Sequence, residues 1–295
     1  MEQKTLYSQL LHNVISANES SYIYSKEPRN YGLNTTVERK WGTWTNESEY
    51  TKHIVTKFSI YDLEGVSFPD FVSKLPNLTT LELPVDFIQD KQFENINKNI
   101  QALVLYEQCD LNRQYMWNEK VVLPNLLYLS IPELLYRFKI PLYCFPKLEW
   151  ISFDLQADKK GVSLFEFSKF KNLKHLIFSH AKNLDVFSPF QNKSIESLSI
   201  YAATGKKFPI EKISSLKSLK YLKINNIKVS FDCSSLRLLP NLEEVDLMNI
   251  NEVINIEDLL KIPTLRSLSI RFCKINMDNT VKEKFINANF QILNI

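Results

Sequence analysis

One pattern of apolar positions repeats along the whole of the 295-residue chain except its N-terminal fifth. Large apolar side chains stand at relative positions 1, 4 and 6 in eleven copies that follow one another at intervals of 22 to 26 residues. Position 1 is Val55, Leu78, Ile100, Leu126, Leu148, Leu173, Ile195, Leu219, Leu242, Leu265 and Phe290. Positions 4 and 6 are two residues apart, so on a β-strand they point to the same face. Each copy therefore predicts one short strand, whose apolar side is buried only by stacking on neighbouring copies.

The residues before each strand have a different period. Apolar side chains step by three in runs such as Val72-Leu75-Leu78-Leu81 and Leu236-Leu239-Leu242-Val245. Steps of three are typical of a 3₁₀ turn or a short helical segment, which here returns the chain from one strand to the next. Proline or asparagine often stands just before position 1, as in LPNL at Leu75 and Leu239, and proline ends such a segment.

The LxxLxL copies over residues 54–295 resemble the leucine-rich repeat family, in its short cytoplasmic-type repeats. The resemblance implies an α/β solenoid, a horseshoe with a parallel β-sheet on its concave side and short 3₁₀ or helical segments on its convex side. It departs from the family at the ninth position, where an asparagine or cysteine usually bonds the backbone of adjacent turns. Only Cys273 conforms. The backbone of these turns must therefore find other partners, and we expect irregular curvature.

The two ends differ from the repeats. Residues 1–53 lack the pattern, and we interpret them as an N-terminal capping segment that covers the first layer of the core. Within it Leu6, Leu10, Leu11, Val14 and Ile15 have helical spacing, and SYIYSKE at Ser21 alternates like a strand. At the other end Asp278 or Asn279 is expected to cap a helix that runs to about Ala288, with Val281 and Phe285 facing inward. The last strand leaves an edge open, which suggests edge-mediated self-association.

Composition limits the partners and the compartment. The net charge is only +3, which gives no electrostatic reason to expect a nucleic acid or an anionic membrane. No apolar stretch is long enough to cross a membrane, and the first residues do not resemble a secretory signal. The four cysteines contain no CxxC pair, which indicates reduced core residues and predicts a cytoplasmic location.

Positions 3, 5 and 7 point away from the core and should form the concave surface. In copies 3 to 8 these positions carry rings interleaved with serines, a composition typical of recognition surfaces. Farther along they carry charges of alternating sign, which suit either a self-neutralising ion-pair network or a specificity rim. The candidate binding residues are Tyr106, Tyr128, Trp150, His175, Tyr201, Tyr221, Lys223, Glu244, Asp246 and Arg271. The rings alternatively reflect the ordinary preference of strands for aromatic residues.

No motif for catalysis emerges. His175, Ser197 and Asp154 can be drawn as a triad, but no G-x-S-x-G elbow or oxyanion donor set accompanies them. No metal-ligand spacing, cofactor motif or P-loop is present. The sequence therefore predicts a non-enzymatic module that binds a protein partner on its concave face, with no cofactor. A narrower hypothesis, by analogy, is an inhibitor or immunity-type role, and the alternative is a small-molecule or glycan receptor that uses Tyr128, Trp150 and Tyr221.

Overall fold

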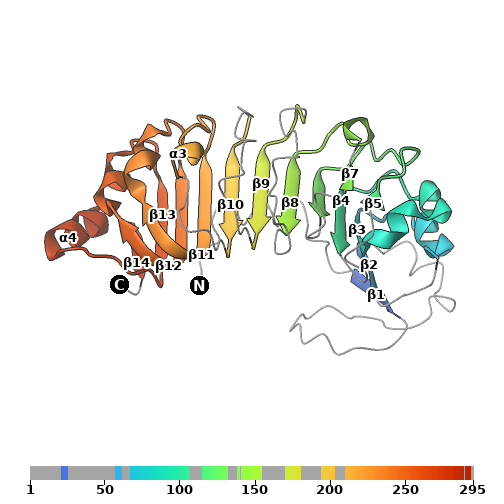
Figure 1. Cartoon of the computed structure of the whole chain (residues 1–295), viewed down its shortest axis with the longest axis horizontal. Helices are drawn as coiled ribbons and strands as arrows, with labels where there is room; N and C mark the ends of the chain where they lie inside the picture. Colours follow the sequence, from blue (N-terminus) through green and yellow to red (C-terminus); the bar gives the residue numbers. More distant parts are fainter. Residues whose placement is uncertain are drawn as a thin grey trace. The chain divides into compact units, whose positions relative to one another are not determined.

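The computed structural model describes residues 21–25, 57–61, 67–106, 115–131, 138–139, 141–154, 170–180, 194–202, 210–288 and 290–293. The chain divides into two compact units, residues 10–149 and residues 150–295 together with residues 1–9. Within each unit the strands of the main sheet lie side by side in chain order (Figure 1). All of their pairings are parallel, as a solenoid of stacked coils requires.

In residues 10–149 the main sheet has the strand order β1-β2-β3-β4-β6. Its strands are β1 (Ser21–Ser25), β2 (Lys57–Tyr61), β3 (Thr80–Pro84), β4 (Ala102–Tyr106) and β6 (Tyr128–Ile131). A second small sheet pairs β5 (Tyr115–Met116) with β7 (Phe138–Lys139). The expected 3₁₀ segments are present at Asp70–Lys74, Val85–Gln89, Lys91–Asn95 and Leu142–Cys144. β1 lies inside the stretch interpreted as a cap and adds a rung ahead of the first repeat, whereas the helical spacing over Leu6–Ile15 lies outside the described residues.

In residues 150–295 the sheet has the order β8-β9-β10-β11-β12-β13-β14. Its strands are β8 (Trp150–Asp154), β9 (His175–Ser179), β10 (Ser197–Tyr201), β11 (Tyr221–Asp232), β12 (Glu244–Ile254), β13 (Ser267–Arg271) and β14 (Gln291–Leu293). Two helices, α3 (Ile210–Ile213) and α4 (Asn279–Asn287), and two 3₁₀ segments, Cys233–Leu238 and Ile256–Lys261, lie between strands.

The register of the sheet places identical repeat positions beside one another. His175, Ser197, Tyr221, Glu244 and Ser267, all at position 3, are Cα partners along five adjacent strands. Side chains at positions 4 and 6, such as Leu222 and Ile224, are at most 3% exposed throughout the described repeats and form the core. The chain therefore has a leucine-rich repeat type of fold, an α/β solenoid of short strands and 3₁₀ segments, as the apolar pattern predicts.

The missing asparagine ladder is replaced by bonds at the other end of the strand. The residue just before position 1 reaches back to the backbone of the preceding repeat: Asn125 Nδ2 donates to Lys98 O (3.2 Å), Ser194 Oγ to Leu173 O (2.7 Å), Asn241 Nδ2 to Lys217 O (2.8 Å) and Thr264 Oγ1 to Leu242 O (2.8 Å). These donors satisfy carbonyl oxygens that the parallel ladder leaves unbonded. The Asn of the LPNL motif thus links neighbouring coils.

After the strand, the backbone turns through a left-handed residue at position 8. This conformation recurs in five repeats, with φ of 54° at His180, 53° at Ala202, 56° at Asn226, 50° at Asn249 and 55° at Phe272. It lets a backbone N–H donate to the next coil, from His180 to Tyr201 O (2.8 Å) and from Ala202 to Asn225 O (2.9 Å). Asn249 Nδ2 also donates to Asn226 Oδ1 (3.1 Å). Asparagine tolerates this conformation, but histidine, alanine and phenylalanine adopt it at a cost.

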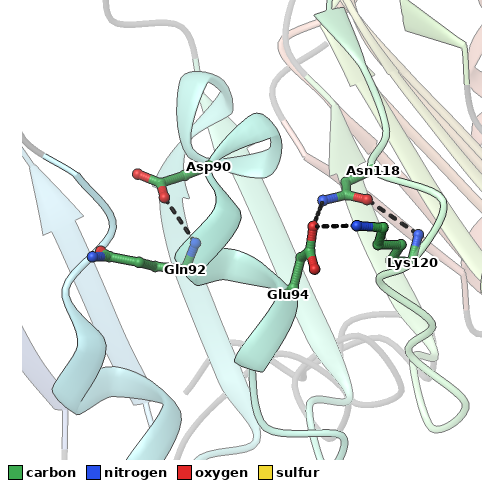
Figure 2. A network of polar contacts seen from close by, with 5 residues as sticks. All are labelled: Asp90, Gln92, Glu94, Asn118 and Lys120. Atoms are coloured by element: carbon green, nitrogen blue, oxygen red, sulfur yellow. Dashed lines mark hydrogen bonds and ion pairs between the residues drawn. The ribbon is translucent and has the colours of Figure 1, made fainter.

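The return segments of neighbouring repeats are also tied together. Figure 2 shows Glu94 Oε1 accepting from Asn118 Nδ2 (3.0 Å) and from Lys120 Nζ (3.4 Å) one repeat farther along. The hydrogen bond from Asn118 lowers the pKa of Glu94 most, with Lys120 adding to it. Asp90 caps its own 3₁₀ segment by accepting from the Gln92 N–H (2.9 Å), and its other oxygen accepts from Phe68 N (2.8 Å). Polar side chains therefore join the coils on the side away from the strands.

The C-terminal helix matches its prediction. Asp278 is the N-cap of α4 and accepts from the Val281 N–H (2.8 Å), and Phe285 is fully buried. β14 follows and pairs with β13, and among the described residues no strand pairs with its other edge. Self-association through that edge stays a prediction.

The unfavourable positive φ at position 8 can be tested by its effect on stability. Ala202→Gly should raise the free energy of unfolding by about 1 kcal/mol, because glycine adopts positive φ freely. Ala202→Val should lower it by at least as much, because a β-branched side chain clashes in this conformation. Urea denaturation of both variants measures the change. Equal stabilities of the two variants would show that Ala202 is not left-handed in solution.

Candidate binding surface

The ten candidate residues lie at positions 3, 5 and 7, on the face of the strands opposite the core. This is the surface predicted to be concave, and we call it the outer face of the sheet. In residues 10–149 it carries Tyr106 on β4 and Tyr128 on β6. In residues 150–295 it carries Trp150, His175, Tyr201, Tyr221, Lys223, Glu244, Asp246 and Arg271, on β8 to β13. The register brings these eight onto adjacent strands of one sheet.

The expectation that the rings are exposed is wrong for half of them. Tyr128 is 7% exposed, Trp150 2% and His175 7%, whereas Tyr106, Tyr201 and Tyr221 are half-buried. The indole of Trp150 and the imidazole of His175 stack with 3.6 Å between ring centroids and 21° between planes. Strand alternation correctly assigns these side chains to the outer face but does not reveal that they are covered there.

Tyr106 has a structural contact. Its hydroxyl donates to the backbone carbonyl of Ile60, so a ring on β4 reaches across β3 to β2. This bond ties three consecutive rungs and orients the ring along the sheet. Part of the aromatic pattern is therefore packing between strands, which was the alternative interpretation.

His175 is a buried, neutral imidazole. Its Nδ1 lies 2.8 Å from Ser197 Oγ on the next strand. Burial lowers its pKa from 6.5 to about 4, opposed by nearby Glu196 and assisted by Lys174 and Lys220. The Ser–His contact resembles the first half of a hydrolytic pair, but Ser197 is 0% exposed, so in this structure no substrate carbonyl reaches its oxygen. The pair stabilises the sheet.

The charges of the outer face pair with one another. The carboxylate of Asp246, 3% exposed, lies 3.4 Å from Lys223 Nζ and 3.2 Å from the Nη2 of Arg271. Lys223 Nζ also lies 5.7 Å from the centroid of the Tyr201 ring. One buried carboxylate thus orients two half-buried cations on β11 and β13, and Glu244 (3% exposed) lies on the same strand as Asp246. The ion-pair network expected from the alternating signs is present.

One surface residue escaped the sequence-based prediction. Phe272 directly follows Arg271, is 58% exposed and has φ of 55°. It stands at position 8, outside the positions that a strand pattern assigns to the outer face. The sequence signal that could have identified it is a large apolar residue directly after the candidate cation Arg271. Phe272, Arg271 and half-buried Met248 on β12 lie at the carboxyl ends of the strands. We call these three residues, which are apolar and cationic, the rim.

The described residues also bear on redox and metal chemistry. Cys144, Cys233 and Cys273 are free thiols, and burial raises the pKa of each. In the part of the chain that the structure describes, no three His, Cys, Asp or Glu side chains gather where they would hold a metal ion.

None of the helices described there has the length and hydropathy needed to span a membrane.

Comparisons with known proteins find only distant similarities. No protein-family model and no curated sequence matches the chain. An internalin from Listeria monocytogenes has a TM-score of 0.48 at 14% identity, over 82% of this chain and 74% of that one. Internalin C2 of the same species has a TM-score of 0.39 at 16% identity, over 83% and 82%. The TLR13–ssRNA13 complex has 0.44 at 19%, over 85% and 34%. The leucine-rich repeat fold is established by this chain's own register and core.

The pKa of His175 predicts a pH-dependent stability. Because the folded-state pKa lies below 6.5, the unfolded chain binds the extra proton, so stability is full above pH 6.5 and falls as the pH drops toward 4. The loss should reach about 3 kcal/mol, from 1.36 kcal/mol per unit of pKa. His175→Gln should remove this part of the pH dependence in urea denaturation at pH 7 and pH 4.5. An unchanged slope in that variant would contradict the assignment.

The Asp246 network makes a second stability prediction. Asp246→Asn should lower the free energy of unfolding by about 1–3 kcal/mol, because two half-buried cations lose their counter-charge. The matched control is Asp70→Asn, which removes an exposed carboxylate 3.8 Å from Lys74 and should change stability by less than about 0.5 kcal/mol. Similar losses in both variants, measured by thermal unfolding, would contradict a structural role for Asp246.

Proposed function

We propose that the chain is a non-enzymatic binding protein that holds a protein partner on the outer face and rim of residues 150–295. The half-buried residues Tyr201, Tyr221, Lys223 and Arg271, with exposed Phe272, are the proposed contacts. Tyrosine, arginine and exposed aromatic side chains are the residue types that contribute most to protein interfaces. In this proposal Asp246 holds Lys223 and Arg271 in place, and the stacked rings of Trp150 and His175 are packed on strands β8 and β9 of the same sheet.

The exposure of Phe272 on a left-handed turn is the observation that carries the proposal. A phenylalanine that is both left-handed and exposed costs the folded chain twice, once in backbone strain and once in apolar surface left in water. A glycine at this position would remove both costs. The left-handed turn itself recurs at position 8 of five repeats, so the support for a binding role comes from the large apolar side chain that this turn holds in solvent.

The alternative function, a receptor for a glycan or small molecule, has less support than a protein-binding function. Sugars stack on open aromatic faces, but the Trp150 ring is 2% exposed and stacks on His175. Of the three rings in that hypothesis, only Tyr221 keeps a half-exposed side chain. The proposal therefore keeps a protein partner first, and the inhibitor or immunity-type role stays a narrower prediction that depends on which partner binds. The buried free thiols favour a reducing, cytoplasmic setting for it.

The test uses Phe272 and a matched position. A photo-reactive amino acid at Tyr221 first captures the partner in the cells from which the chain comes, and the affinity for that partner is then measured by calorimetry. Phe272→Gly should raise the stability of the chain by about 1 kcal/mol and weaken binding by tenfold or more.

His180→Gly is the control, because it relieves the same backbone conformation after β9, four strands from β13, where the side chain is not among the proposed contacts. It should raise stability and leave the affinity unchanged. If Phe272→Gly gains stability and keeps full affinity, the rim does not bind the partner.

A further inference from the structure

A row of charges crosses the sheet of residues 150–295 at the amino ends of its strands. Position 2 of the repeat stands directly before the strand, and in copies 6 to 10 it reads Lys174, Glu196, Lys220, Glu243 and Arg266. The sign of the charge therefore changes at every step. Backbone bonds link these residues in order, because each N–H donates to the carbonyl of the residue before it in the row, at 2.7 to 2.8 Å. We call these five residues the charge row.

The side chains of the charge row interact along it. Lys220 Nζ lies 2.9 Å from Glu196 Oε2, in a pair whose side chains are 38% and 31% exposed. This hydrogen bond raises the pKa of Lys220 most, burial opposes the rise, and the charge of Glu243 on the other neighbouring coil adds to it. Lys220 is thus attracted to a carboxylate on each side.

The same backbone bonds form without these charges in residues 10–149. There position 2 is Thr79, Gln101, Leu127 and Glu149, and each N–H again donates to the carbonyl of the preceding coil, at 2.7 to 3.0 Å. Three of these four residues are uncharged. The strand ladder therefore does not require charge at position 2, and the alternating signs need another explanation.

The apolar core alone does not distinguish all the coils of residues 150–295 from one another. β10 and β13, in copies 7 and 10, begin with the same four residues, SLSI. What differs is position 2, because Glu196 precedes β10 and Arg266 precedes β13. With β13 in the place of β10, Arg266 would lie beside Lys220. Such misassembly of similar units is a characteristic failure of repeat proteins.

We propose that the charge row fixes the order in which these coils stack. Each coil attracts a neighbour of opposite sign, whereas a stack that skips one coil brings like charges together on strands about 4.8 Å apart. Because a skipped coil leaves the apolar positions matched, the charge at position 2 is what opposes the skip. The proposal concerns the assembly of the solenoid and does not depend on the proposed function of the outer face.

The first part of the test exchanges two charges in the full chain. Glu243→Lys/Arg266→Glu leaves the net charge unchanged but gives Lys220 a neighbour of its own sign. The equilibrium constant for unfolding, measured by urea denaturation at low salt, should rise about three- to tenfold. The control, Glu252→Lys/Lys274→Glu, exchanges two exposed charges on the same two coils outside the row and should change this constant by less than about twofold.

The second part makes the same exchange in a chain that lacks one coil. Deletion of residues 220–242 joins Leu219 to Glu243, keeps the repeat spacing and places Glu243 beside Glu196. Here Glu243→Lys/Arg266→Glu restores the alternation, so the unfolding constant should fall about three- to tenfold, opposite to the change in the full chain. Both effects should shrink in 1 M salt, where charges are screened within about 3 Å.

Opposite effects of the exchange in the two chains are the result expected. Effects of the same sign in both, or no effect in the full chain, would overturn the proposal. If the shortened chain folds only with the exchange, as judged by circular dichroism, that result supports the proposal as well. If it folds in neither form, the full chain decides: a loss confined to the charge-row variant supports the proposal, and an equal loss in the control overturns it.

Discussion

The parallel stacking of coils over one shared apolar interior is the constraint on which the rest of this structure depends. A strand of five residues cannot bury its apolar side alone, so each coil is stable only between neighbours. The register that results aligns every repeat position with its equivalents. Equivalent positions therefore form rows that run across the sheet. The residue types in each row determine the chemistry of the surface. Lys223 and Asp246 are neighbours in one such row, and Arg271 reaches Asp246 from the next strand, two residues farther along.

The family of leucine-rich repeats usually stabilises these coils after the strand, and this chain does so before it. Asn125, Ser194, Asn241 and Thr264 bond the preceding coil from the residue ahead of position 1. The turn after the strand depends instead on left-handed residues, none of the five described being glycine, in a chain that has only five glycines. The same backbone requirement is thus met with different side chains, which explains how the fold is kept without the family's asparagine ladder.

Much of the fold could be predicted from the sequence, because its signals are local and periodic. The strands, the 3₁₀ returns and the cap of α4 at Asp278 follow from spacing and from capping chemistry. The candidate surface could be predicted less well. Alternation along a strand assigns Trp150 and His175 to a side of the sheet but carries no information on what lies above them. Phe272 was missed because a positive φ leaves no mark in the apolar pattern when the residue is not glycine. The Asn of LPNL marks the approach to the strand in the sequence, but spacing alone does not predict that its amide bonds the preceding coil.

The bonds ahead of position 1 all run in one direction, from a side chain in a later repeat to a backbone oxygen in an earlier one. Each repeat thereby brings with it the donor that fastens it to the coil before it. During synthesis the earlier coil leaves the ribosome first, so its acceptor is already in place when the donor emerges. The solenoid can consequently lengthen from its N-terminal end one coil at a time, without waiting for the rest of the chain.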